Sequence, residues 1–181
     1  ALQKAGYQTG LFGKWHLGDE EEYLPQNRGF NEVLMHGAGG IGQYKYGDFK
    51  ANTEHPYFDN VLLHNDTIVR TEGFCTDVFF SAALAWIKRQ HDAKRPFFAY
   101  IALNAPHGPM IAPEQYKKRF LDLGFDENTA ARYGMVENID TNFGALLAKL
   151  KEWDLEDNTL VIYLGTDNGA TAGRNVFNAG M

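Results

Sequence analysis

The chain has 181 residues, of which 44% are hydrophobic and 22% charged, with a formal net charge of −6. These values predict one globular domain with a substantial core, and they exclude an intrinsically disordered chain. The negative charge argues against nucleic-acid binding, and no apolar run is long enough to span a membrane. We therefore expect neither a nucleic-acid nor a membrane partner.

The first polar pair of interest lies in residues 7–18, a run punctuated by glycines that allow tight turns against a ligand. In an extended segment, residues i and i+2 project from the same face. Lys14 and His16 would therefore point together, and Trp15 would turn the other way into apolar packing. A cation beside an imidazole can hold an anion and move a proton. The alternative is a strand end with a solvated lysine and a hydrogen-bonded histidine.

The next stretch is poor in regular pattern. The acidic run 19–22 predicts a solvated turn. Residues 25–57 are rich in Gly, Asn, Tyr and His, which predicts a long loop near a functional cleft. The glycine run 37–42 within it is not interpreted as a dinucleotide-binding motif, because we expect no strand before it and no apolar helix after it.

A hairpin and a helix are predicted next. Apolar residues on both sides of His64-Asn65-Asp66 predict a hairpin over 61–69. Helical spacing of apolar residues predicts a helix over 73–91. Cys75, the single cysteine of the chain, falls in its first turn and excludes an intrachain disulfide. We interpret Cys75 as a packing residue rather than a reactive thiol, because no cationic residue is near it in sequence.

Two apolar runs, 96–103 and 159–164, predict strands buried on both faces. A short helix over 113–121 and a longer one over 128–153 are predicted between them. The longer helix carries one apolar stripe, which we assign to the core: Val136, Ile139, Phe143, Leu146, Leu147, Leu150 and Trp153.

Polar residues follow both predicted strands. His107 comes after the first, and Asp167 and Asn168 come after the second. In open α/β sheets, ligands bind beyond the carboxyl ends of the strands. The oxygens of Asp167 and Asn168 suit Ca²⁺ or Mg²⁺ rather than Zn²⁺. The alternatives are a loop histidine held by a backbone carbonyl and an Asx turn.

These elements predict an α/β fold with a layered, mixed and mainly parallel sheet. Its strand ends would then gather Lys14, His16, His107, Asp167 and Asn168 around one oxyanion. Such a set suits hydrolysis of a sulfate or phosphate ester. The cation and the lysine would stabilise developing charge, and a histidine would protonate the leaving oxygen.

Three motifs resemble those of the type I sulfatases of the alkaline phosphatase superfamily: residues 6–18, Asn104-Ala105-Pro106-His107 and Thr166-Asp167-Asn168-Gly169. The resemblance implies an alkaline-phosphatase-like α/β/α fold, arylsulfatase-like hydrolysis of sulfuric esters and an aryl or carbohydrate sulfate as substrate. It also suggests a periplasmic or secreted protein.

The resemblance also implies roles for the candidate residues. Lys14 would contact the sulfate and a catalytic aldehyde hydrate, and His16 would hydrogen-bond that hydrate. His107 would bind a sulfate oxygen and protonate the leaving alcohol. Asp167 and Asn168 would be ligands of Ca²⁺ in preference to Mg²⁺.

The nucleophile of that family is a formylglycine made from Cys or Ser in a C/S-x-P-x-R motif, which residues 1–181 do not contain. We therefore interpret residues 1–181 as the central part of a sulfatase-like catalytic domain, without the nucleophile segment and the C-terminal part. We expect the isolated chain to lack full activity and to bind Ca²⁺ no more tightly than about millimolar. An exposed sheet edge would favour homo-oligomers.

Two alternatives remain at the level of the sequence. One is a phosphodiesterase or phosphonate hydrolase of the same superfamily, which uses a similar cation and histidine set. The other is a noncatalytic module that binds an oxyanion or a glycan.

Overall fold

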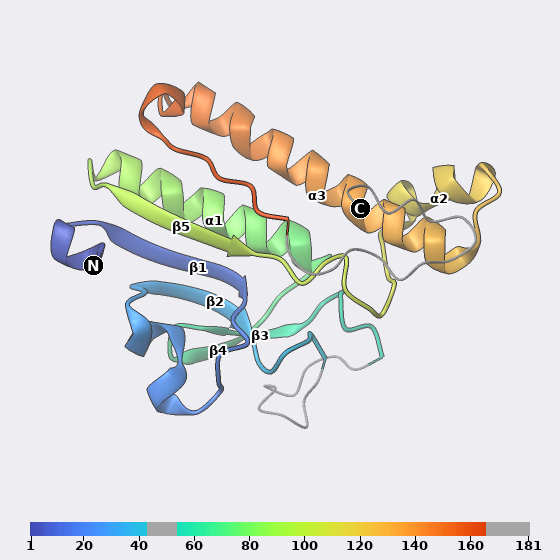
Figure 1. Cartoon of the computed structure of the whole chain (residues 1–181), viewed down its shortest axis with the longest axis horizontal. Coiled ribbons are helices and arrows are strands. Elements are labelled where there is room, and N and C mark those ends of the chain that lie inside the picture. The colour runs from blue at the N-terminus through green and yellow to red at the C-terminus, as the bar shows by residue number, and fades with distance from the viewer. Residues whose placement is uncertain (43–53, 166–181) are drawn as a thin grey trace.

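A computed structural model describes residues 1–42 and 54–165 and shows a five-stranded sheet covered on one face by helices (Figure 1). The strand order is β4-β3-β2-β1-β5. The strands are β1 (Gln8–Lys14), β2 (Glu32–His36), β3 (Val61–His64), β4 (Thr67–Arg70) and β5 (Phe97–Ala102). β1 pairs in parallel with β2 and β5, whereas β3 pairs antiparallel with β2 and β4. The predicted mixed α/β sheet is confirmed.

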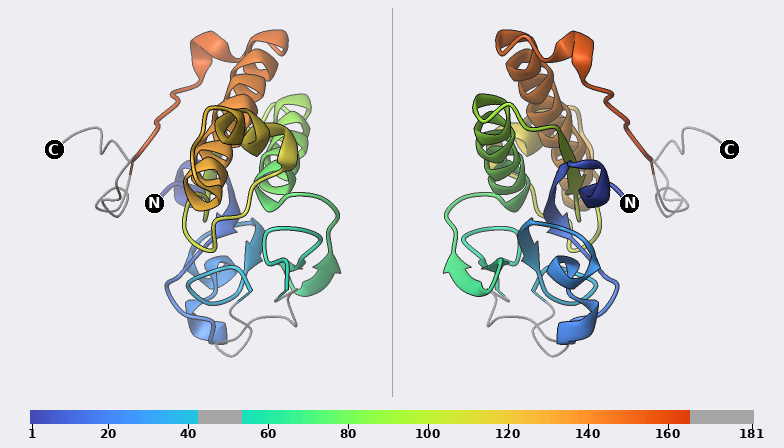
Figure 2. Two further views of the ribbon diagram at one scale, coloured as in Figure 1. Left: turned by 90° about the vertical axis from the view of Figure 1, so that its right-hand side faces the viewer. Right: turned by 90° about the vertical axis from the view of Figure 1, so that its left-hand side faces the viewer.

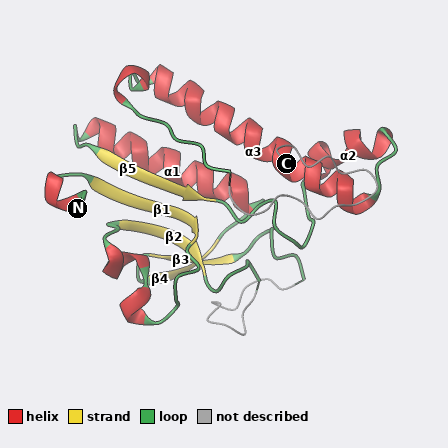
Figure 3. Cartoon of the chain, viewed as in Figure 1, coloured by secondary structure: helices red, strands yellow, loops and turns green. Residues whose placement is uncertain are grey.

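Three α-helices lie on the same side of this sheet (Figures 2 and 3). They are α1 (Cys75–Asp92), α2 (Glu114–Asp122) and α3 (Glu127–Glu152). α1 packs on β1 and β5, and α3 packs on α1 and α2. Short 3-10 helices cover Gln3–Ala5, Glu21–Tyr23, Pro25–Arg28 and Glu156–Asn158. No helix within residues 1–42 and 54–165 is both long enough and apolar enough to cross a bilayer.

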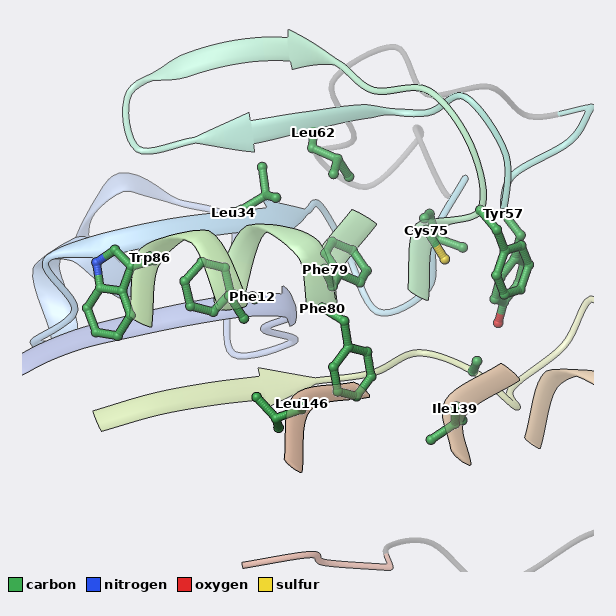
Figure 4. Packing of buried hydrophobic residues seen from close by; sticks show 14 of the residues in the cluster. Phe12, Leu34, Tyr57, Leu62, Cys75, Phe79, Phe80, Trp86, Ile139 and Leu146 are labelled. Atoms are coloured by element: carbon green, nitrogen blue, oxygen red, sulfur yellow. The ribbon is translucent and has the colours of Figure 1, made fainter. Parts of the chain in front are cut away.

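Side chains alternate between the two faces of the sheet and pack into two separate cores. On the helical face, Phe12 and Leu34 pack with Phe79 and Trp86 of α1 (Figure 4). The rings of Phe12 and Trp86 lie 5.8 Å apart. Because aromatic side chains bury large apolar areas, this cluster joins the sheet to α1.

The opposite face has a smaller core, made by four buried side chains of β1, β2 and β3: Leu11, Val33, Met35 and Leu63. Trp15, Leu24 and Phe30 pack against it from the connection between β1 and β2. In the described part of the chain, irregular and 3-10 segments therefore take the place of an α-helical layer on this face.

Most predicted elements are present, but β2 was not predicted. Glu32–His36 has only five residues and no polar–apolar alternation, because four of the five are buried. It lies inside the segment 25–57 that was interpreted as a loop. A strand therefore precedes the glycine run 37–42, and the expectation that no strand lies before it was wrong.

The predicted strand 159–164 is also wrong. Its apolar side chains are largely exposed, up to 84% for Leu160, and the segment forms no ladder. A strand requires backbone partners on a neighbouring strand. The segment instead runs back along the outside of the helices (Figure 2), where Tyr163 contacts Phe143 at 5.7 Å between ring centroids.

Burial was overestimated at two further places. β5 is partly buried on one face and exposed on the other, where Phe98 and Tyr100 are 39% and 44% exposed. On α3, Ile139, Leu146 and Leu150 are buried and Phe143 and Trp153 pack against the core. Val136 and Leu147 of the same predicted stripe are exposed. One side of β5 and part of the α3 stripe thus remain uncovered by the described residues.

Candidate functional site

The carboxyl ends of three parallel strands lie side by side at one edge of the sheet. Lys14 ends β1 and His36 ends β2, and the two residues are partners in the parallel register. On the other side of β1, Gly13 pairs with Ala102, the last residue of β5. The register therefore brings Lys14, His36 and the loop after β5 to a common edge, the usual ligand-binding edge of an α/β sheet.

Gly13 allows β1 and β5 to approach closely at this edge. Its φ is +124°, and a Cβ at this position would overlap the carbonyl oxygen of Ala102. Only glycine combines this dihedral angle with the absence of a side chain. The glycine spacing noted in the sequence thus has a packing role beside Lys14.

Lys14 and His16 do not sit on one extended strand as predicted, because β1 ends at Lys14. His16 has φ +59°, in the left-handed region, so strand alternation does not place its side chain. Its exposed imidazole lies directly against Gly39, where a Cβ would overlap Nε2. Trp15 does turn into apolar packing as predicted, and its Nε1–H donates to the Tyr23 carbonyl at 2.8 Å.

Asp19 holds the glycine run in place over His16. Both of its carboxylate oxygens accept from the Ala38 N–H, at 3.0 and 2.9 Å. Ala38 has φ +56°, so this bond supports a backbone conformation that is costly for a residue with a Cβ. Burial raises the pKa of Asp19, and the bond from Ala38 opposes that shift. Asp19 was predicted as part of a solvated turn, and its acidic neighbours in sequence masked this role.

His36 is a buried histidine that was not among the residues predicted for the site. Its side chain is 1% exposed, and its Nδ1–H donates to the Gly37 carbonyl at 2.8 Å. Since a carbonyl can only accept, Nδ1 carries the proton. Nε2 is buried and has no hydrogen-bond partner among the described residues. Burial lowers the pKa of His36 to about 4, and the charges of Lys14 and His16 act in the same direction. His36 is therefore neutral at pH 7.

His107 lies in the turn that follows β5, with its imidazole exposed. Its backbone N–H donates to the Asn104 carbonyl at 2.9 Å, which closes the turn. Its Nδ1–H donates to the Gly108 carbonyl at 2.8 Å. His107 is therefore held by a backbone carbonyl through Nδ1, as the alternative interpretation expected. Nε2 is left to accept a proton or to donate one.

Cys75 is a packing residue, as predicted. It is 3% exposed, its Sγ–H donates to Asn104 Oδ1 at 3.7 Å, and burial raises its thiol pKa to about 12. Reactivity requires a thiolate, which this environment disfavours. Cys75 cannot supply the missing nucleophile.

The predicted cation ligands Asp167 and Asn168 lie outside the described residues. Within residues 1–42 and 54–165, no three His, Cys, Asp or Glu side chains lie close enough together to hold a metal ion. A Ca²⁺ site normally needs six or more oxygen ligands. The described residues therefore do not form a metal site by themselves.

The structure defines an α/β protein in which Lys14, His36 and the loop after β5 share the carboxyl edge of the parallel strands. A family model described as Sulfatase matches residues 1–180. The chain belongs to the sulfatase family.

Curated relatives agree with this assignment. The chain is 33% identical to the N-acetylgalactosamine-6-sulfatase of Canis lupus familiaris, over 93% of this chain and 32% of the relative. It is 26% identical to the arylsulfatase of Klebsiella aerogenes, over 97% of this chain and 47% of the relative. The chain thus spans less than half the length of either relative.

Solved structures share the fold. The structure of Ps i-CgsB in complex with k-i-k-neocarrahexaose has a TM-score of 0.74 at 28% identity, covering 87% of this chain and 36% of that one. The structure of BT4656 in complex with its substrate D-glucosamine-2-N,6-O-disulfate has a TM-score of 0.64 at 17% identity, a likeness of fold alone. It covers 87% of this chain and 46% of that one.

Proposed function

We propose that this chain supplies the oxyanion-binding and proton-donating side chains of an enzyme that hydrolyses sulfuric esters of carbohydrates. The observation that carries the proposal is the strand register, which brings Lys14 and the His107 turn to one carboxyl edge. Membership of the sulfatase family and the printed names of its relatives support the choice of sulfate over other oxyanions.

The roles follow from the chemistry of each side chain. Lys14 is a half-buried point charge that binds a sulfate oxygen and stabilises the negative charge that develops there. His16 borders the same edge and hydrogen-bonds the nucleophile of the complete enzyme. His107 donates from Nε2 to the leaving alcohol oxygen, because Nδ1 is already committed to Gly108.

Asp167 and Asn168 are proposed as two ligands of Ca²⁺, with the remaining ligands outside the described residues. The nucleophile, a formylglycine in this family, has no counterpart in residues 1–181, since Ser81 and Cys75 both lack the flanking Pro and Arg of the motif. In the isolated chain the edge therefore binds an oxyanion without turning over an ester.

Calorimetric titration of the chain with sodium sulfate tests the binding. We expect millimolar affinity, and a loss of at least about tenfold in both Lys14→Ala and His107→Ala, the cost of one charged hydrogen bond each. Lys118→Ala is the matched control, because it removes one positive charge from exposed α2, where Lys118 pairs with Asp122. Equal losses in the control and the two variants would mean that binding is nonspecific.

An aryl sulfate assay in the same preparation tests the chemistry. No turnover above the uncatalysed rate is expected. Turnover that His107→Ala abolishes would contradict the assignment of the nucleophile to a segment outside this chain. Preferential binding of phosphate diesters over sulfate would support the phosphodiesterase alternative instead.

A further inference from the structure

Tyr57 is fixed at the junction between the sheet and the start of α1. Its side chain is 0% exposed, and its ring stacks on Phe74, with centroids 5.6 Å apart and planes inclined by 20°. Its carbonyl accepts from the Cys75 N–H at 2.8 Å. Figure 4 shows Tyr57 beside Cys75 at this junction. With ring and backbone both held, the phenol oxygen has a defined position.

That oxygen reaches the turn that carries His107. The hydroxyl donates to the His107 carbonyl at 2.6 Å and lies 3.3 Å from the Asn104 carbonyl. Asn104 is the first residue of the turn and His107 is the last, and the bond from the His107 N–H to the Asn104 carbonyl closes it. One buried hydroxyl, fifty residues away in sequence, therefore contacts both ends of the turn.

The hydroxyl is a permanent donor. Burial is the main cause that raises the pKa of Tyr57 far above its ordinary value. It therefore remains protonated over the whole range in which a histidine titrates. By contrast, the His107 side chain is exposed, and its only hydrogen bond within the described residues is to the adjacent Gly108. The placement of the imidazole depends on its backbone.

We infer that Tyr57 is a positioning residue for His107, fixing through its hydroxyl the turn that aims the imidazole at the carboxyl edge of the sheet. Its relevance to catalysis rests on the proposed function, whereas its effect on the turn does not. Tyr57→Phe removes the hydroxyl and keeps the ring in its stack on Phe74, so the core is preserved.

Amide hydrogen exchange of the full chain, measured by NMR, tests the effect on the turn. In Tyr57→Phe we expect the His107 N–H to exchange about tenfold faster, the effect of one lost hydrogen bond. Amides of β1 should be unchanged. Tyr7→Phe is the matched control, because it removes a hydroxyl from a partly exposed tyrosine before β1. An unchanged His107 amide, or equal acceleration throughout the chain, would overturn the inference.

A double-mutant cycle on sulfate affinity tests the link to His107. Tyr57→Phe should weaken sulfate binding roughly threefold in the wild-type background and have no effect in His107→Ala. The same loss in both backgrounds would show that Tyr57 does not act through His107 and would overturn the inference. If the wild-type chain does not bind sulfate, the proposed function fails and the exchange experiment alone decides on Tyr57.

Discussion

His36 sits at the carboxyl end of β2 as a neutral imidazole almost without solvent contact. Lys14 is its partner in the register of β1 and β2. The charges of Lys14 and His16 both lower the pKa of His36, as burial does. A protonated His36 would place a further positive charge beside Lys14, and the described residues offer Nε2 no hydrogen-bond acceptor. The fold therefore keeps this residue uncharged, which links stability to pH.

We predict that His36 makes the chain less stable as the pH falls below 6.5. Its pKa is about 4 in the folded chain and 6.5 in the unfolded chain, so the unfolded state binds a proton first. The stabilisation that comes from keeping His36 neutral is therefore fully present above pH 6.5. As the pH falls towards 4, the free energy of unfolding decreases by about 3 kcal/mol in total. Urea unfolding between pH 4.5 and 7.5 should show this loss in the wild-type chain relative to His36→Gln.

The control for this prediction is His91→Gln, which removes a histidine from the last turn of α1. The free energy of unfolding should depend on pH in the same way in the wild type and in His91→Gln. Parallel stability curves for the wild type and His36→Gln would contradict the prediction, since His36 would then titrate alike in the folded and unfolded chain.

At the same scale, the sequence reveals polar candidate residues more readily than residues whose roles arise from burial. Lys14, His16 and His107 stand out because they interrupt glycine-rich or apolar runs. Asp19 and Tyr57 do not, because their roles arise from contacts with backbone atoms distant in sequence. Such contacts become visible only once the chain is folded.

At the scale of elements, the long periodic segments and the hairpin of β3 and β4 were predicted well, whereas β2 was missed and the segment 159–164 is not a strand. α1 and α3 begin and end within two residues of their predicted bounds. β2 was missed because five residues carry too little pattern. The segment 159–164 has the composition of a strand, but composition cannot supply the neighbouring strand that would complete its hydrogen bonds.

The contact between β1 and β5 yields a prediction at this scale. Gly13→Ala should lower the free energy of unfolding by about 3 kcal/mol, because the new Cβ overlaps the Ala102 carbonyl in an unfavourable φ region. Gly124→Ala is the control, with φ +88° and no atom within 4 Å of the new Cβ, and should lose about 1 kcal/mol. Urea unfolding of both variants measures the difference. Equal losses would show that β5 shifts to accommodate the methyl group.

At the scale of the whole molecule, several apolar side chains of the described residues remain exposed. β5 is an edge strand with Phe98 and Tyr100 exposed on one face, and residues 160–164 expose further apolar side chains. Unpaired edges and apolar patches of this kind favour association with another chain. The predicted homo-oligomer therefore remains our expectation for the isolated chain.

Sedimentation velocity over a range of concentrations tests this expectation. The wild-type chain should show a mean mass that rises with concentration, and the double variant Leu160→Lys with Ile162→Lys should reduce the rise. Leu123→Lys is the control, because Leu123 is 71% exposed at the end of α2, away from β5. A concentration-independent monomer mass for the wild type would refute the expectation.

The antiparallel pairing of β2 with β3 has a consequence for how this protein family can diversify. Leu34 and Met35 pair with His64 and Leu63, so the chain that leaves at His36 is returned to the sheet at Val61. The backbone pairing of β2 with β3 thus joins the two ends of this connection, whatever the length or composition of the residues between them. Changes of length in the middle of this connection therefore leave the pairing of β2 with β3 intact, provided that Tyr57 near its end keeps its contacts with Phe74 and the His107 turn.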